Sequence, residues 1–396
     1  MTITRREFTL GTAGLAGVAS AGLLGPALAQ SGTIKIGWLG ALTGASSAPG
    51  IGFDRGLRYA VEAVNGAGGV KGRMIELVTR DTQGDPTKAV NATQEMISSV
   101  KVAAIFGPTN SGEALATTPI MARAKMPNLH PCVVNSLIDP RKYPNSFRIA
   151  PSNSQWDDAV RHYCLQVLKI KKVAVIGDTT GYGTTATGDS VAGFKKDGAE
   201  VVYTAQIDAT QPDMTPDMLR MKNAGAQAIV AWSTSTGMAA RLFNARAGLS
   251  WDVPFVGHPS LGSGEVGRLI DKPANWDRVY TVNYRSCSFD AQGRLPARTQ
   301  KFLDRAKGKI DLKDTLLWWV LCGVDVVQLL AKAIETEGTA GPGLIKYFDG
   351  LTNYPGLFGD YTWSVTQHNG YPTDEVVMGA ANSSKDGALN LAPGYG

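Results

Sequence analysis

The residues of this sequence that could do chemistry are hydroxyl and amide side chains in short turns that follow strands. The stretch IFGPTNSGEALA ends a strand, passes Gly-Pro, and presents Thr109, Asn110 and Ser111 at the start of a predicted helix. Backbone N–H groups at a helix N-terminus have no partner within the helix and attract negative charge. Hydroxyl and amide groups there add hydrogen bonds to an anion. The turn is therefore predicted to bind an anion.

Four further turns of this kind come directly after other predicted strands. Their sequences are HPCVVN (130–135), DTTGYG (178–183), WSTST (232–236) and GHPSLGSG (257–264). Parallel strands end at one edge of their sheet, so these turns should gather on one side. A Ser or Thr at a helix start also stabilises that helix by about 1 kcal/mol without any ligand. Five such turns together favour a binding cleft over five isolated helix caps.

Recognisable catalytic motifs are absent from the sequence. It contains no G-x-S-x-G, H-E-x-x-H or G-x-x-x-x-G-K-[ST] pattern. The Gly-Pro turn lacks the lysine of a phosphate-binding loop, so nucleotide binding is not expected. The four cysteines show no CxxC spacing, which argues against a metal site and leaves one or two disulfides open; they are Cys132, Cys164, Cys287 and Cys322. We therefore expect a binding protein without catalysis, cofactor or metal.

Length, composition and charge indicate how many domains the chain can form and which partners are not expected. A chain of 396 residues with 43% hydrophobic and 18% charged content can form two domains with well-buried cores. The net charge of +5 is modest and comes without any run of Lys or Arg. The usual footprint of nucleic-acid binding is therefore missing.

The N-terminal segment has the layout of an export signal. Arg5, Arg6 and Phe8 precede a Gly/Ala-rich apolar run that ends in Ala-Leu-Ala. The pattern predicts a signal peptide of the twin-arginine type over residues 1–29, cleavage after Ala29, and a periplasmic location. No later segment is expected to be long and apolar enough to span a membrane, so the mature chain is predicted to be soluble.

Short β-branched runs alternate with helical periodicity along the rest of the chain. In the first half, strands are predicted at residues 33–40, 73–81, 102–107 and 126–134, and helices at 52–64, 86–98 and from 111. The pattern then restarts with a helix at 155–168 and strands at 171–178, 199–206, 226–233, 253–257 and 277–285. Helices at 296–307 and 315–337 and strands at 360–365 and 375–380 follow. This alternation predicts an α/β fold of two units with parallel sheets.

Four motifs carry a resemblance to a known family: AVEAVNGAGGVKGRMIELVTRD, GDPTKAVNATQEMI, AAIFGPTNSGEALA and VAVIGDTTGYG. On these motifs the sequence resembles the periplasmic leucine/isoleucine/valine-binding proteins, the type I solute-binding proteins of ABC importers. The resemblance covers nearly the whole chain after the signal. It implies two Rossmann-like domains joined by a three-strand hinge, with the ligand cleft between them. Residues 31–151 with 284–361 would form the first domain, and 152–283 with 362–396 the second.

The resemblance also implies a function and a set of ligand contacts. The domains would close on one small solute without catalysis, and the monomeric protein would deliver it to ABC permease subunits with cytoplasmic ATPases. Ser111 matches the serine that holds the solute's carboxylate in the amino-acid binders. The other candidate contacts are Thr109 and Asn110 on the same turn, Cys132, Val133 and Val134 on the next, Tyr182, Thr234, His258 and Pro259 in the second unit, and the aromatic residues Trp232 and Trp319.

One departure from the family changes the expected ligand. The carboxylate that pairs with the ligand's α-ammonium should fall near Pro259, where this chain has no acidic residue. A buried ammonium without a counter-charge costs several kcal/mol. We therefore expect an organic acid without an α-amino group, aromatic acids included, since four tryptophans could flank a flat or apolar body: Trp38, Trp232, Trp318 and Trp319. A branched-chain or other apolar amino acid is the close alternative, and a ligand-sensing receptor domain the remote one.

Overall fold

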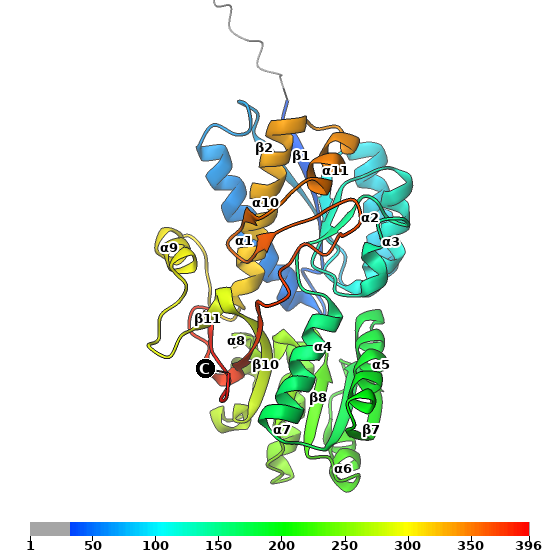
Figure 1. Cartoon of the computed structure of the whole chain (residues 1–396), viewed down its shortest axis with the longest axis vertical. Helices are drawn as coiled ribbons and strands as arrows, with labels where there is room; N and C mark the ends of the chain where they lie inside the picture. Colours follow the sequence, from blue (N-terminus) through cyan, green and yellow to red (C-terminus); the bar gives the residue numbers. More distant parts are fainter. Residues whose placement is uncertain (1–31, 396) are drawn as a thin grey trace, which may run out of the picture.

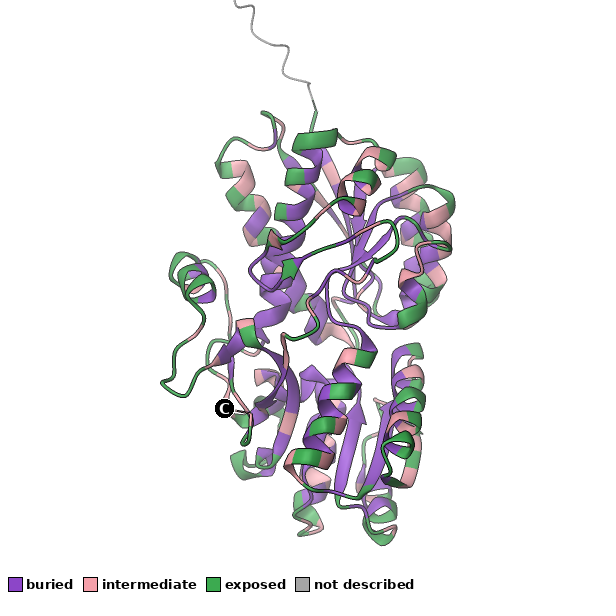
Figure 2. Cartoon of the chain, viewed as in Figure 1, coloured by how far each residue is buried: buried purple, intermediate pink, exposed green. Residues whose placement is uncertain are grey.

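The structure, a computed structural model, describes residues 32–395 of the chain. The predicted signal peptide and its cleavage site after Ala29 lie outside the described residues. The described part folds into two lobes along its long axis, each built on one sheet (Figure 1). The strand interiors and the inner faces of the helices are buried, and the outer helix faces are exposed (Figure 2).

The first lobe is built on a five-stranded parallel sheet in the order β2-β1-β3-β4-β5. Its strands are β1 (Ile34–Gly40), β2 (Ile75–Asp81), β3 (Ala104–Phe106), β4 (Asn128–His130) and β5 (Ser146–Arg148). Its helices are α1 (Ser47–Gly66), α2 (Pro86–Glu95), α3 (Ser111–Arg123), α10 (Leu317–Glu337) and α11 (Gly341–Asp349). Figure 1 shows them around the upper sheet.

The second lobe is built on a six-stranded sheet in the order β14-β10-β9-β8-β6-β7, parallel except for β14. Its strands are β6 (Lys172–Asp178), β7 (Glu200–Ile207), β8 (Ala228–Trp232), β9 (Phe255–Gly257), β10 (Val279–Tyr284) and β14 (Val376–Ala380). Its helices are α4 (Asn153–His162), α5 (Gly181–Lys196), α6 (Thr215–Asn223), α7 (Thr236–Gly248) and α8 (Gly264–Leu269).

The remaining elements lie beside the two sheets. Two short strand pairs join β11 (Ser288–Phe289) with β15 (Leu389–Asn390) and β12 (Tyr354–Pro355) with β13 (Asp360–Tyr361). Helix α9 (Ala297–Ala306) packs Phe302 edge-on against Tyr59 of α1, with the ring centroids 5.7 Å apart.

The structure confirms the predicted α/β class with two Rossmann-like units. The predicted strand at 360–365 is wrong in extent, because the strand covers only Asp360–Tyr361 and Ser364 forms a separate bridge to Gln367. The predicted helix at 155–168 starts at Asn153, where Ser152 accepts a hydrogen bond from Gln155 N, and continues past His162 as a wider turn. Strand β5 and helix α11 were not predicted. The domain boundaries stay a prediction.

Helix α10 is long and apolar enough to cross a membrane, contrary to the sequence-based expectation. In the structure most of it is buried, and it packs along α1. Two glycines bring the helix backbones together. A Cβ at Gly56 would lie 2.1 Å from Val320 O, and one at Gly323 would lie 2.5 Å from Phe53 O. Composition alone cannot separate a core helix from a spanning one.

All four cysteines are buried and unpaired. The disulfides left open by the sequence therefore do not form. Burial raises the pKa of each thiol above its ordinary value, so the thiols are neutral.

The contact between α1 and α10 gives a stability prediction. Gly56→Ala should lower the free energy of unfolding by about 1–3 kcal/mol, because the added methyl group overlaps Val320 O and forces the helices apart. Gly66→Ala is the matched control, since a Cβ at Gly66 of the same helix would meet nothing within 4 Å. Its effect should stay within about 0.5 kcal/mol. Chemical denaturation measures both, and equal effects of the two substitutions would contradict the proposed backbone contact.

Candidate ligand-binding site

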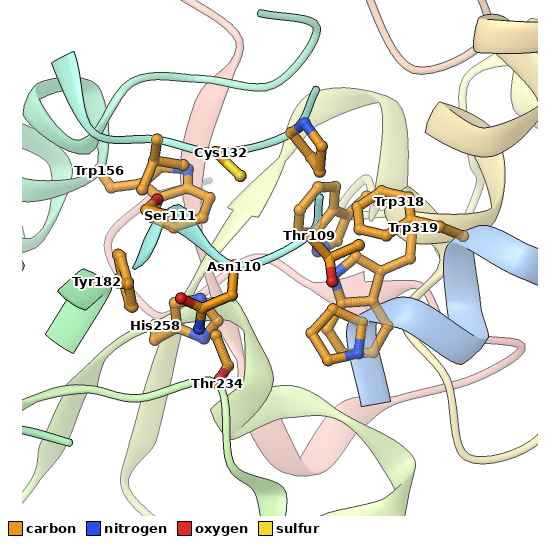
Figure 3. Close-up of a pocket in the computed structure, with 14 residues that line it drawn as sticks. Thr109, Asn110, Ser111, Cys132, Trp156, Tyr182, Thr234, His258, Trp318 and Trp319 are labelled. Atoms are coloured by element: carbon orange, nitrogen blue, oxygen red, sulfur yellow. The ribbon is translucent and has the colours of Figure 1, made fainter. Parts of the chain in front are cut away.

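A cavity of about 30 Å³ lies between the two lobes (Figure 3). Its lining residues come from helix starts and strand ends of both lobes: Pro49, Phe53, Thr109, Asn110, Ser111, Pro131, Cys132, Val133, Trp156, Tyr182, Thr234, His258, Trp318 and Trp319. Figure 3 shows Trp318 and Trp319 together on one side and Tyr182 on the other, with His258 and Thr234 across from Cys132. The cavity exceeds the roughly 10–15 Å³ that one water molecule needs.

The two lobes touch at the rim of this cavity. Thr234 of the second lobe donates to Ser46 Oγ of the first at 3.0 Å. The starts of α3 and α5 also meet, since a Cβ at Gly181 would lie 2.9 Å from the Cα of Gly112. The cleft is therefore closed in this structure.

The turn before α3 forms one wall and holds its shape without a ligand. Asn110 accepts a hydrogen bond from Gly112 N at 2.8 Å, and Glu113 accepts one from Asn110 N at 3.3 Å. The Thr109 hydroxyl accepts from Ala41 N at 3.3 Å at the end of β1. Asn110 Nδ2 is buried and has no partner among the described residues. The N–H groups of Asn110 and Gly112 are thus paired within the turn, and Ser111, the first helical residue, lines the cavity.

A chain of ring contacts forms the other walls. The Trp156 ring meets His258 at 5.3 Å, Tyr182 at 6.4 Å and Trp318 at 6.4 Å between centroids, all edge to face. Trp318 in turn contacts Phe53 at 5.6 Å and Trp319 at 5.9 Å. Four helices therefore contribute to one aromatic enclosure, which suits a flat or apolar solute body.

The titratable rings of this enclosure are neutral. Burial lowers the pKa of His258 to about 3. Its Nδ1 accepts a hydrogen bond from Ser260 N at 3.0 Å, so the ring proton lies on Nε2, which can donate. Burial raises the pKa of Tyr182 well above its ordinary value, so its O–H stays intact. That hydroxyl and the indole N–H groups of Trp318 and Trp319 have no partner among the described residues.

The carboxylates nearest the cavity in sequence accept hydrogen bonds from other residues of the protein. Asp178 accepts from Thr180 N at 3.0 Å and from Thr234 N at 3.4 Å, and Glu265 accepts from the Thr236 hydroxyl at 2.8 Å. Burial raises the pKa of Glu113 to about 7. None of these acids lines the cavity. The described residues contain no cluster of three or more His, Cys, Asp or Glu suited to a metal ion.

The structure brings nine of the twelve predicted contacts to the cavity: Thr109, Asn110, Ser111, Cys132, Val133, Tyr182, Thr234, His258 and Trp319. It does not bring the other three there. Val134 packs into a small apolar cluster with Leu137. Trp232, the last residue of β8, is fully buried in the main core, and Pro259 begins a buried helical turn.

Sequence reasoning missed five lining residues as contacts: Pro49, Phe53, Pro131, Trp156 and Trp318. Helical periodicity predicts Phe53 only as part of a core face. Trp318 is indicated only as an aromatic residue that could flank a flat body. Trp156 is a third missed residue. The available signal for it was an aromatic side chain near the start of a helix that follows a strand.

Comparisons with known proteins identify the family. The family model described as "Periplasmic binding protein" matches residues 33–386. The chain belongs to this family. A similar curated relative is Leu/Ile/Val-binding protein homolog 3 of Brucella melitensis, 28% identical over 54% of this chain and 58% of the relative. The aligned part thus spans less than two thirds of that relative's length.

Two solved structures show the same fold. The periplasmic binding protein type 1 of Bordetella pertussis is 26% identical, with a TM-score of 0.79 over 91% of this chain and 100% of that one. A solute-binding protein of an ABC transporter from Rhodopseudomonas palustris, in complex with 3,4-dihydroxybenzoic acid, is 19% identical, with a TM-score of 0.73 over 90% and 95%. The relatives are binding proteins, in line with the absence of catalytic motifs.

The buried His258 predicts a pH effect on stability. Its pKa is about 3 in the folded chain against 6.5 for an unperturbed histidine, so the unfolded state binds more protons between these values and stability falls below about pH 6.5. By about pH 5 the loss from this residue is roughly 2 kcal/mol. The stability advantage of the wild type over His258→Gln should shrink by that amount between about pH 7.5 and pH 5. Denaturant titration at both pH values tests this, and parallel pH profiles would contradict it.

Proposed function

We propose that this chain is the extracytoplasmic solute-binding protein of an ABC importer, and that its cleft captures a small solute bearing a carboxylate. The solute is an organic acid without an α-amino group, aromatic acids included. The two lobes close around it, and the loaded protein is recognised by permease subunits with cytoplasmic ATPases. Export through the twin-arginine pathway to the periplasm belongs to the same proposal.

The observation that carries the proposal is the excess of hydrogen-bond donors at the cavity. Asn110 Nδ2, the Tyr182 hydroxyl and the N–H groups of Trp318 and Trp319 lack acceptors among the described residues. An unsatisfied buried donor costs about 1–3 kcal/mol. A carboxylate has about four acceptor sites and no donor, so it is the small group that best complements such a cavity.

The absence of a lining carboxylate argues against an α-amino acid. An ammonium group brings three donors into a cavity already rich in donors, and Asp178 and Glu265 are engaged elsewhere. Aromatic faces attract cations by about 0.5–2 kcal/mol, which offsets only part of the lost hydration. The solved complex with 3,4-dihydroxybenzoic acid has an aromatic acid as its ligand in the same fold.

A branched-chain amino acid is the second candidate, favoured by the name of the Leu/Ile/Val-binding relative. The apolar walls formed by Phe53, Val133 and the tryptophans suit a branched aliphatic side chain as well as an aromatic one. The two candidates share the carboxylate and differ in the amino group. Paired ligands that differ only in that group separate them.

Calorimetric titration of such pairs tests the proposal. We expect 3-phenylpropionate to bind at least about tenfold more tightly than phenylalanine, and 4-methylpentanoate more tightly than leucine, a difference of about 1.4 kcal/mol. The reason is the missing partner for the ammonium group. Tighter binding of either amino acid would contradict the proposed ligand class and favour the amino-acid alternative.

The role of the turn before α3 gives a second test. Ser111→Ala should weaken binding of the preferred carboxylate by about 1.5–3 kcal/mol, the range for a hydrogen bond to a charged group. Ser235→Ala is the matched control, because Ser235 caps α7 through Met238 N and does not line the cavity. It should cost about 1 kcal/mol of stability and leave affinity unchanged. Unchanged affinity in a folded Ser111→Ala protein would place the anion elsewhere.

A further inference from the structure

Arg148 is a fully buried charge with almost no partners. It is the last residue of β5, paired in register with His130 of β4, and its side chain has no exposed surface. Its Nη1 donates to the carbonyl oxygen of Val133, a residue that lines the cavity. Its Nε and Nη2 are buried and have no partner among the described residues. The guanidinium therefore lies directly behind one wall of the cavity.

A second buried arginine shows how this fold satisfies such a group elsewhere. Arg246 of α7 is also buried, and its guanidinium donates to Val253 O at 3.0 Å, Asn275 O at 2.7 Å and Asp277 O at 2.8 Å. Three carbonyl oxygens thus surround Arg246, whereas Arg148 has one. Burying a guanidinium whose N–H donors lack acceptors lowers the stability of the folded state. The position of Arg148 beside the cavity is therefore not explained by a contribution to folding.

No charge around Arg148 balances it. Burial lowers its pKa to about 9, and it stays protonated at neutral pH. The neighbouring His130 is neutral, since burial and the arginine lower its pKa to about 3. Burial raises the pKa of the Cys132 thiol, so it carries no negative charge either. Residues 32–395 supply no carboxylate in an ion pair with Arg148.

Arg148 also changes what the cavity wall can accept. The carbonyl oxygen of Val133 receives Arg148 Nη1 and, at 2.9 Å, the backbone N–H of Asn153. Both of its lone pairs are used. This carbonyl is therefore closed to a ligand ammonium, while the positive charge behind it favours a ligand anion.

We propose that Arg148 determines the charge selectivity of the cleft: it makes the site favour a carboxylate over a neutral or cationic group, acting through the turn at Val133 without touching the solute. The inference rests on the proposed function, which supplies the carboxylate. Arg148 is thus a positioning residue. An uncompensated charge in a poorly hydrated site acts over several ångströms because little water screens it.

The test compares one carboxylate with its uncharged isostere, 3-phenylpropionate with 3-phenylpropionamide, by calorimetry. Arg148→Met removes both the charge and the hydrogen bond to Val133, Arg148→Gln keeps a donor, and Arg148→Lys keeps the charge. We expect the two neutral variants to lose about tenfold or more in affinity for the acid and less than about threefold for the amide. Arg148→Lys should keep most of the preference for the acid.

Arg246→Met is the matched control for loss of a buried arginine, and it should lower stability without changing the acid-to-amide ratio. A folded Arg148→Met or Arg148→Gln protein that retains the wild-type ratio overturns the inference and leaves the proposed function standing. The inference also fails if Arg246→Met shifts the ratio equally, or if neither neutral variant folds. A wild-type protein that binds neither probe, or both equally, contradicts the proposed function itself.

Discussion

The balance of hydrogen-bond donors and acceptors in the closed cleft is the constraint on which the rest of the site depends. Asn110 Nδ2, the Tyr182 hydroxyl and two indole N–H groups belong to residues that line the cavity, and they have no acceptor in the described chain. Leaving them unpaired is costly, and the acceptor-rich solute that we propose would pair them. The same constraint explains why Asp178 and Glu265 are held by threonines of the second lobe, away from the cavity. Within the described residues, the cavity thus lacks hydrogen-bond acceptors for its buried donors and lacks a lining carboxylate.

The aromatic and polar walls of the cavity are positioned by the packing of α1 against α10 and by the ends of the strands. The glycines that let α1 and α10 touch also set the position of Phe53 against Trp318. The carboxyl ends of both sheets then supply the polar turns, as expected for open α/β sheets. The lobes meet through Thr234 and Ser46, at the starts of α3 and α5, and through the rings of Trp156 and Trp318. These contacts must break when the cleft opens to admit or release a solute.

Local sequence signals predicted most of the fold, and nine of the twelve residues proposed as ligand contacts lie at the cavity. The polar turns were found because Ser, Thr and Asn at helix starts have recognisable spacing. Trp156 and Phe53 were missed because their places at the cavity depend on how the lobes pack. Trp232 was included but lies in the core away from the cavity lining, because the end of a strand says little about which face its last side chain occupies. The isolation of Arg148 depends on distances between strands, which no local pattern encodes.

A crystal structure with bound 3-phenylpropionate tests the central claim most directly. We predict that the cavity has widened around the ligand, with the carboxylate within hydrogen-bonding distance of the Ser111 hydroxyl and of backbone N–H groups at the start of α3. The phenyl ring should lie among Trp156, Trp318 and Trp319. A carboxylate directed at the second lobe or at solvent, with the turn before α3 unoccupied, would contradict it.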